Sequence, residues 1–212
     1  MNPRVFVKIC GLRTAQDVTA AVESGADAGG FVLTDSVRKV DEITVRTLAG
    51  RVPPEVLTVG VFRDESVETI RAAIARTGVA AIQVYRDYPA SSFRAGGWHG
   101  IQVIRGVRLR ESAAPRYGEC GEDMLLIDSP VPGSGEAWDW QGFAGLAPGR
   151  WILAGGLRLD NVAAGIRHLR PWGIDVSSGV ESAPGRKDPE LIRRFIAAAR
   201  QVGTGPGETE SR

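Results

Sequence analysis

A thiol and a carboxyl group each stand at the end of a short apolar run, and together they could act as an acid–base pair. Cys10 ends the run 4–10, and Asp128 ends the run 124–128. If both runs are strands of one parallel barrel, the two side chains meet at the same rim, because the carboxyl ends of parallel strands lie at one end of a barrel. Side chains alternate between the two faces of a strand, so Lys8 shares a face with Cys10.

Two turns late in the chain have the composition of an anion site. The stretches 153–157 and 175–181 combine a strand end with small residues, namely Gly155, Gly156, Ser177, Ser178 and Gly179. Glycine lets the backbone approach an anion closely, and the amides of such turns can point at phosphate oxygens. Turns after the seventh and eighth strands of a barrel form the usual phosphate site of such enzymes. The alternative is that Gly155–Gly156 is only a tight strand-to-helix turn.

Short apolar runs alternate with amphipathic runs along the chain, which predicts a parallel sheet with helical crossovers. The expected strands are 5–10, 28–33, 57–62, 80–85, 101–106, 123–128, 151–154 and 173–177. The expected helices are 14–23, 41–50, 66–76, 138–145, 159–168 and 188–200. Eight strands in this length predict an α/β fold, a compact (β/α)8 TIM barrel. An open doubly wound sheet is the alternative, but Gly11-Leu12-Arg13 is not its glycine fingerprint.

Two connections are too rich in glycine and proline for full helices, so the helices after the fourth and fifth strands are expected to be reduced. These connections are 86–100 and 107–122. Residues 1–202 contain no linker-like stretch and are expected to form one barrel domain. The polar, glycine-rich tail 203–212 is expected to be disordered.

Composition excludes several classes of protein. The 212 residues are 43% hydrophobic and 24% charged, and the net charge is +1, which gives no sign of a nucleic-acid or membrane partner. Cys10 and Cys120 form neither a disulfide framework nor a metal motif. No apolar run reaches the roughly 18 residues of a membrane span, and no signal-peptide core precedes the first strand. We therefore expect a cytoplasmic protein without a metal site.

A set of motifs occurs in the order typical of one enzyme family. They are Lys8-Ile9-Cys10-Gly11, Gly30-Phe31-Val32, Val59-Gly60-Val61-Phe62, Leu126-Ile127-Asp128, Gly133-Ser134-Gly135 with Trp138-Asp139-Trp140, Leu153-Ala154-Gly155-Gly156-Leu157, Asp175-Val176-Ser177-Ser178-Gly179-Val180-Glu181 and Pro184-Gly185-Arg186-Lys187-Asp188. Over about residues 4–200 the chain resembles the phosphoribosylanthranilate isomerases of tryptophan biosynthesis. The resemblance implies an Amadori rearrangement of N-(5-phosphoribosyl)anthranilate to 1-(2-carboxyphenylamino)-1-deoxyribulose 5-phosphate, without a metal or organic cofactor. It also implies a small phosphosugar substrate and a monomer or homodimer.

The resemblance assigns roles to individual residues. Cys10 would be the general base and Asp128 the general acid, and Arg38 would contact the anthranilate carboxylate. The phosphate would lie on the small residues Gly155, Gly156, Ser177, Ser178 and Gly179. Further substrate-binding residues are Gln83, Tyr85 and Asp175, and Asp175 is also expected to pair with Lys8 between the first and eighth strands.

The chemistry of these groups is consistent with that reaction. Opening the ribosylamine needs a protonated acid at the ring oxygen, and a carboxyl group in a partly apolar site can have a raised pKa. Removing the proton from C2 of the iminium needs a base, and a thiolate serves if a positive neighbour lowers its pKa.

Three departures keep other functions open. Tyr85 stands where the family usually has histidine, and the loops before Arg38 and after Asp128 are short, with Pro132-Gly133 in place of Gly-Gly. A divergent paralogue acting on a related phosphoribosyl amine, or a non-catalytic phosphate-binding barrel, would also fit. A histidine-pathway sugar isomerase, with paired aspartates ending strands 1 and 5, fits poorly, because these strands are expected to end in Cys10 and Arg105-Gly106.

Overall fold

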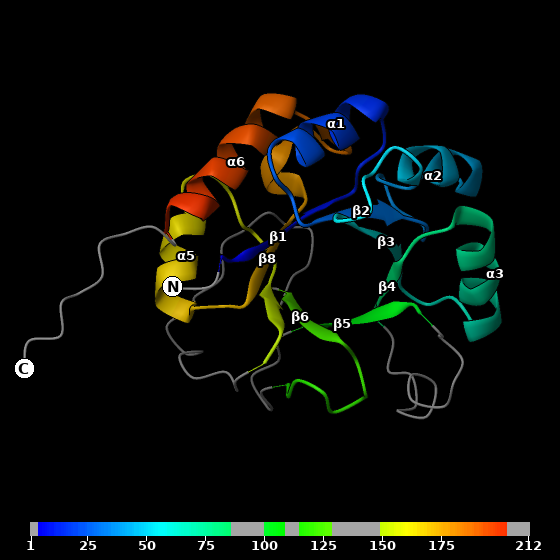
Figure 1. The fold of residues 1–212 in the computed structure, drawn as a ribbon. Coiled ribbons are helices and arrows are strands. Elements are labelled where there is room, and N and C mark those ends of the chain that lie inside the picture. The colour runs from blue at the N-terminus through cyan, green and yellow to red at the C-terminus, as the bar shows by residue number, and fades with distance from the viewer. Residues whose placement is uncertain (1–3, 86–99, 109–114, 129–148, 203–212) are drawn as a thin grey trace, which may run out of the picture.

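Eight short apolar runs form the strands of a closed parallel barrel in the computed structural model, which describes residues 4–85, 100–108, 115–128 and 149–202 (Figure 1). The strands are β1 (Phe6–Cys10), β2 (Ala28–Val32), β3 (Leu57–Phe62), β4 (Ala81–Val84), β5 (Gln102–Arg108), β6 (Met124–Asp128), β7 (Trp151–Leu153) and β8 (Gly173–Val176). Each strand pairs with its chain neighbours, and β1 closes the barrel by pairing with β8. The predicted (β/α)8 barrel is confirmed, and the open sheet is excluded.

Helices follow most strands and cover the outside of the barrel. They are α1 (Ala15–Glu23), α2 (Glu42–Ala49), α3 (Val67–Thr77), α5 (Val162–Leu169) and α6 (Pro189–Gln201). Local chemistry fixes where they begin: Thr14 caps α1 in a capping box, and Asp188 caps α6 directly before its first-turn proline. Around the barrel, α1 packs against α6, and α2 against α3 (Figure 1).

Several predictions fall wholly or partly outside the described residues. The expected helix 138–145, the motifs and loop at 132–140 and the tail 203–212 all lie there, as does most of the connection 86–100. In the β5–β6 connection, the described residues 115–123 form turns and no helix, as the glycines and proline of this segment predict. None of the described helices is both long and apolar enough to cross a membrane.

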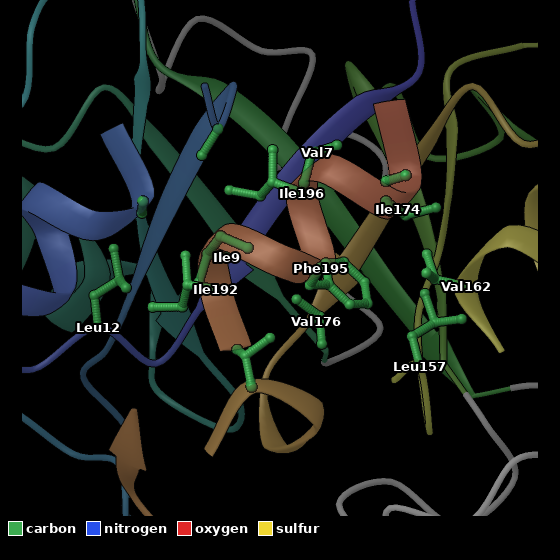
Figure 2. Packing of buried hydrophobic residues seen from close by; sticks show 14 of the residues in the cluster. Val7, Ile9, Leu12, Leu157, Val162, Ile174, Val176, Ile192, Phe195 and Ile196 are labelled. Carbon is green, nitrogen blue, oxygen red and sulfur yellow. The ribbon is translucent and has the colours of Figure 1, made fainter. Parts of the chain in front are cut away.

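The two faces of each strand serve different purposes. On β1, Val7 and Ile9 point outward and pack against Ile192 and Phe195 of α6 (Figure 2). The alternate residues of the strands point into the barrel, where Cys10, Met124 and Leu126 belong to an interior cluster. Cys10 and Asp128 are the last residues of β1 and β6, and both side chains line one pocket at the predicted rim of the barrel.

Two features were not predicted. After β8 the chain forms a short 3-10 turn, η2 (Ser178–Val180), and then a two-stranded hairpin of β9 (Glu181–Ala183) and β10 (Arg186–Lys187). Strand β5 was expected to end at Gly106 but continues to Arg108, which pairs in register with Asp128. Both features extend the rim at which the predicted site lies.

Candidate active site

A pocket opens at the carboxyl ends of the barrel strands and brings together most of the predicted site residues. Its lining includes Cys10, Arg38, Gln83, Tyr85, Asp128, Gly155, Gly156, Asp175, Ser177 and Ser178. Of the predicted residues only Gly179 does not line it. The lining also includes Thr34, Ser36, Arg63 and Arg108, which sequence analysis did not single out.

Cys10 lies at the end of β1 beside a buried ion pair. The Lys8 ammonium is fully buried and its Nζ lies 2.9 Å from Oδ1 of Asp175, which confirms the predicted pair between β1 and β8. Burial opposes the charge on Lys8, but Asp175 and Cys10 outweigh burial and raise the pKa of Lys8. Burial also raises the pKa of the Cys10 thiol, and the opposing effects of Lys8 and Lys187 do not cancel that rise. The positive neighbour expected from the chemistry is therefore present, but desolvation is the larger effect on the thiol.

Asp128 ends β6 and is held in a hydrogen-bonded chain. The Tyr85 hydroxyl lies 3.3 Å from Oδ2 of Asp128, to which it donates, and Gln83 Nε2 donates to the same hydroxyl over 2.9 Å. Burial, together with the nearby carboxyl group of Asp128, raises the pKa of Tyr85 well above its usual 10.0, so the phenol stays neutral and keeps its proton. Cys10 on β1 and Asp128 on β6 therefore line the same pocket from two different strands.

The two predicted phosphate turns touch each other. Gly155 and Gly156 have φ angles of +80° and +66°, the left-handed region that favours glycine. A Cβ on Gly179 would lie 1.9 Å from the carbonyl oxygen of Leu157, so only glycine allows this close approach. Gly179 therefore allows the turn after β8 to pack directly against the turn after β7. Oγ of Ser177 donates a hydrogen bond to the Cys10 carbonyl oxygen over 3.1 Å.

The unpredicted hairpin supplies the residues that hold Arg38. Nε and Nη2 of Arg38 donate to the two carboxylate oxygens of Glu181 over 2.7 and 2.9 Å. Nζ of Lys187 lies 2.8 Å from Oε1 of Glu181 and also donates to both oxygens of Ser177. Burial alone would raise the pKa of Glu181, but hydrogen bonds from Arg38 and Lys187 lower it to about 2.

One sequence signal could have found this hairpin. Pro184-Gly185 separates two short polar runs and is typical of a turn. Arg38 was expected to face the substrate carboxylate, and the structure places it in the pocket wall, ion-paired to Glu181.

The comparisons with known proteins identify the family of this chain. The sequence model of the family described as PRAI: N-(5'phosphoribosyl)anthranilate (PRA) isomerase matches residues 7–198. The chain belongs to this family. This match confirms the resemblance seen in the motifs, and the protein is an isomerase of tryptophan biosynthesis.

Relatives and solved structures of the PRA isomerase family match almost the whole chain. The N-(5'-phosphoribosyl)anthranilate isomerase of Magnetococcus marinus is 40% identical, over 96% of this chain and 99% of its own length. The crystal structure of TrpF from Jonesia denitrificans is 39% identical with a TM-score of 0.84, and the match covers 95% of this chain and all of that one. A PRA isomerase in complex with reduced 1-(o-carboxyphenylamino)-1-deoxyribulose 5-phosphate is 32% identical with a TM-score of 0.77, over 93% of this chain and 99% of that one.

Proposed function

We propose that this PRA isomerase rearranges N-(5'-phosphoribosyl)anthranilate to 1-(2-carboxyphenylamino)-1-deoxyribulose 5-phosphate, with Asp128 as general acid and Cys10 as general base. The observation that carries these roles is their placement. A carboxyl group on β6 and a thiol on β1 line one pocket, together with two turns shaped for an anion. The proposed reaction consists of proton transfers within one substrate, so it requires no metal or organic cofactor.

The pocket offers a separate partner for each part of the substrate. Backbone amides of the turns at Gly155–Gly156 and Ser177–Ser178 would bind the phosphate. Arg38 would bind the anthranilate carboxylate: its guanidinium carries five N–H groups, and Glu181 engages Nε and Nη2. Glu181 thereby fixes the plane of the guanidinium and leaves Arg38 able to bridge protein and ligand.

Gln83 is suited to contact the sugar. The residue is 1% exposed, and among the described residues its Oε1 has no hydrogen-bond partner. A buried acceptor without a donor costs free energy, and a substrate hydroxyl would remove that cost on binding. Asp175 lines the same wall but is already paired with Lys8, so its proposed contribution is to keep that ammonium beside the thiol.

Two proton transfers by enzyme groups, followed by a tautomerisation of the intermediate, then complete the reaction. Asp128 gives its proton to the ring oxygen as the bond from C1 to that oxygen breaks, and the nitrogen lone pair forms the iminium. The Cys10 thiolate removes the proton from C2, the electrons of that bond form the C1=C2 double bond, and the iminium nitrogen regains its lone pair. The resulting enolamine loses the proton of its C2 hydroxyl group and gains one at C1, which gives the ketone. Lys8 and Lys187 favour the thiolate against the effect of burial. Binding at both ends of the substrate orients C2 and the ring oxygen between these groups.

The experiment that tests this function pairs turnover with binding. Freshly prepared N-(5'-phosphoribosyl)anthranilate is incubated with the purified protein and the product is identified chromatographically. Calorimetry with reduced 1-(o-carboxyphenylamino)-1-deoxyribulose 5-phosphate measures binding independently. We expect turnover by the wild type, and analogue binding without turnover by Asp128→Asn. Binding without wild-type turnover would mean a non-catalytic phosphate-binding barrel, and neither binding nor turnover would favour a paralogue with another substrate.

The remaining predictions concern the state of the protein in the cell. Cytoplasmic location, a monomeric or homodimeric state, and the single domain 1–202 stay predictions from the sequence. Size-exclusion chromatography with light scattering would decide the oligomeric state.

A further inference from the structure

Tyr85 lies against a strand position that has no side chain. It follows β4 directly, and its ring lies over Gly106 of the neighbouring strand β5. A Cβ on Gly106 would stand 2.7 to 3.0 Å from three atoms of the ring, closer than real Cβ contacts. The phenol therefore crosses β5 only because position 106 is glycine, and this crossing carries its hydroxyl to Asp128 on β6.

The hydrogen bonds at Tyr85 form a chain from Gln83 through the phenol to Asp128. Gln83 Nε2 donates to the phenol oxygen, so the phenol hydrogen is directed at Oδ2 of Asp128. The separation of 3.3 Å is long for an O–H···O bond, which leaves room for shortening when the acceptor becomes more negative. Hydrogen bonds at catalytic groups commonly tighten only in the complex with substrate.

We propose that Tyr85 is the positioning residue of the general acid, holding the Asp128 carboxyl group toward the substrate through a hydrogen bond that strengthens as Asp128 loses its proton. The inference rests on the proposed function of Asp128. The proton that leaves Asp128 goes to the ring oxygen of the substrate, and Tyr85 keeps its own proton throughout. A bond that is stronger in the transition state than in the bound ground state raises kcat and leaves KM nearly unchanged.

This role gives a physical reason for the tyrosine at position 85, which the sequence analysis counted as a departure from the family's motifs. An imidazole is shorter than a phenol and could not span the same distance across β5 from position 85. The ring also fills the space over Gly106, so tyrosine and glycine fit each other sterically. Tyr85→His is accordingly expected to lower kcat.

The test compares kcat and KM for Tyr85→Phe and the wild type with N-(5'-phosphoribosyl)anthranilate. Phenylalanine keeps the ring over Gly106 and removes only the hydroxyl. We expect kcat to fall by about 10- to 100-fold, the range for losing a hydrogen bond to a group that becomes charged, with KM within about twofold. Tyr117→Phe is the matched control: its hydroxyl donates to the Asp123 carbonyl oxygen away from the pocket, and its kinetics should equal those of the wild type.

A double variant separates action through Asp128 from a general structural effect. If Tyr85 acts through Asp128, Tyr85→Phe should not lower further the residual rate of Asp128→Asn. Binding of the reduced product analogue shows that each variant retains its pocket. An unchanged kcat in Tyr85→Phe, a raised KM with unchanged kcat, or equal losses in both backgrounds would overturn the proposal. A failure of the proposed function is distinct, because it would appear as absent turnover in the wild type itself.

Discussion

Replacing Glu181 by glutamine should destabilise the barrel and loosen Arg38. The carboxylate is the common partner of Arg38 and Lys187, and its side chain is only 4% exposed, so water screens these pairs little. Folding lowers the pKa of Glu181 from 4.5 to about 2. That difference corresponds to about 3 kcal/mol of unfolding free energy at neutral pH. Glutamine keeps the shape but not the charge, so Glu181→Gln should lose about 2–3 kcal/mol.

The pH dependence of this loss has a definite sign. A carboxyl group with a lowered pKa in the folded state stabilises fully above its unfolded pKa, 4.5, and this stabilisation is lost as pH falls toward 2. The stability difference between the wild type and Glu181→Gln should therefore be largest near pH 7 and shrink below 4.5. Kinetically, KM should rise, because the guanidinium of Arg38 is no longer held in one plane.

Urea unfolding near neutral pH and at about pH 3.5 measures this difference. Glu190→Gln is the matched control, since its carboxylate forms an exposed ion pair with Arg193 and its loss should cost less than about 1 kcal/mol. Equal stability of Glu181→Gln and the wild type near neutral pH would refute the reasoning. So would a stability difference that does not change between the two pH values.

Three further substitutions test other parts of the site. Gly179→Ala should lower both stability and phosphate affinity, because its Cβ would clash with the Leu157 carbonyl oxygen. Urea unfolding and calorimetry with inorganic phosphate measure these effects, and a variant unchanged in both would refute the close approach of Gly179 to Leu157. Ser178→Asp should raise KM by about tenfold or more with little change in kcat, because it sets a carboxylate against the phosphate; a normal KM would remove this turn from the phosphate site. Lys8→Met should cost about 3–5 kcal/mol in urea unfolding by leaving Asp175 buried and unpaired, and adding Asp175→Asn should recover part of that loss; no recovery would contradict the pairing.

Much of the fold follows from local patterns in the sequence. Short apolar runs alternating with amphipathic runs predicted all eight strands, and the strand ends placed the thiol of Cys10 and the carboxyl group of Asp128 at one rim of the barrel. The carboxyl ends of all strands of a parallel barrel lie at the same end of the barrel. Residues at strand ends could therefore be assigned to one site without knowledge of the side-chain packing.

The unpredicted parts depend on contacts between distant segments. Glu181 and Arg38 are 143 positions apart, and nothing local in either segment indicates their pairing. The hydrogen bond from Tyr85 to Asp128 depends on the register of β4, β5 and β6 and on the absence of a side chain at Gly106. The pKa of Cys10 depends on burial, which a sequence motif does not report.

The central claim is that Cys10 is the base that removes the C2 proton of the substrate. Its most direct test is the turnover of N-(5'-phosphoribosyl)anthranilate by the wild type and by Cys10→Ser, with deuterium at C2 of the substrate. We predict a folded serine variant that binds the reduced product analogue, with kcat lower by about 10²- to 10⁴-fold, because a hydroxyl is a far weaker base than a thiolate. A kcat of Cys10→Ser close to that of the wild type, with the same deuterium isotope effect on turnover as in the wild type, would contradict the assignment of Cys10 as the base.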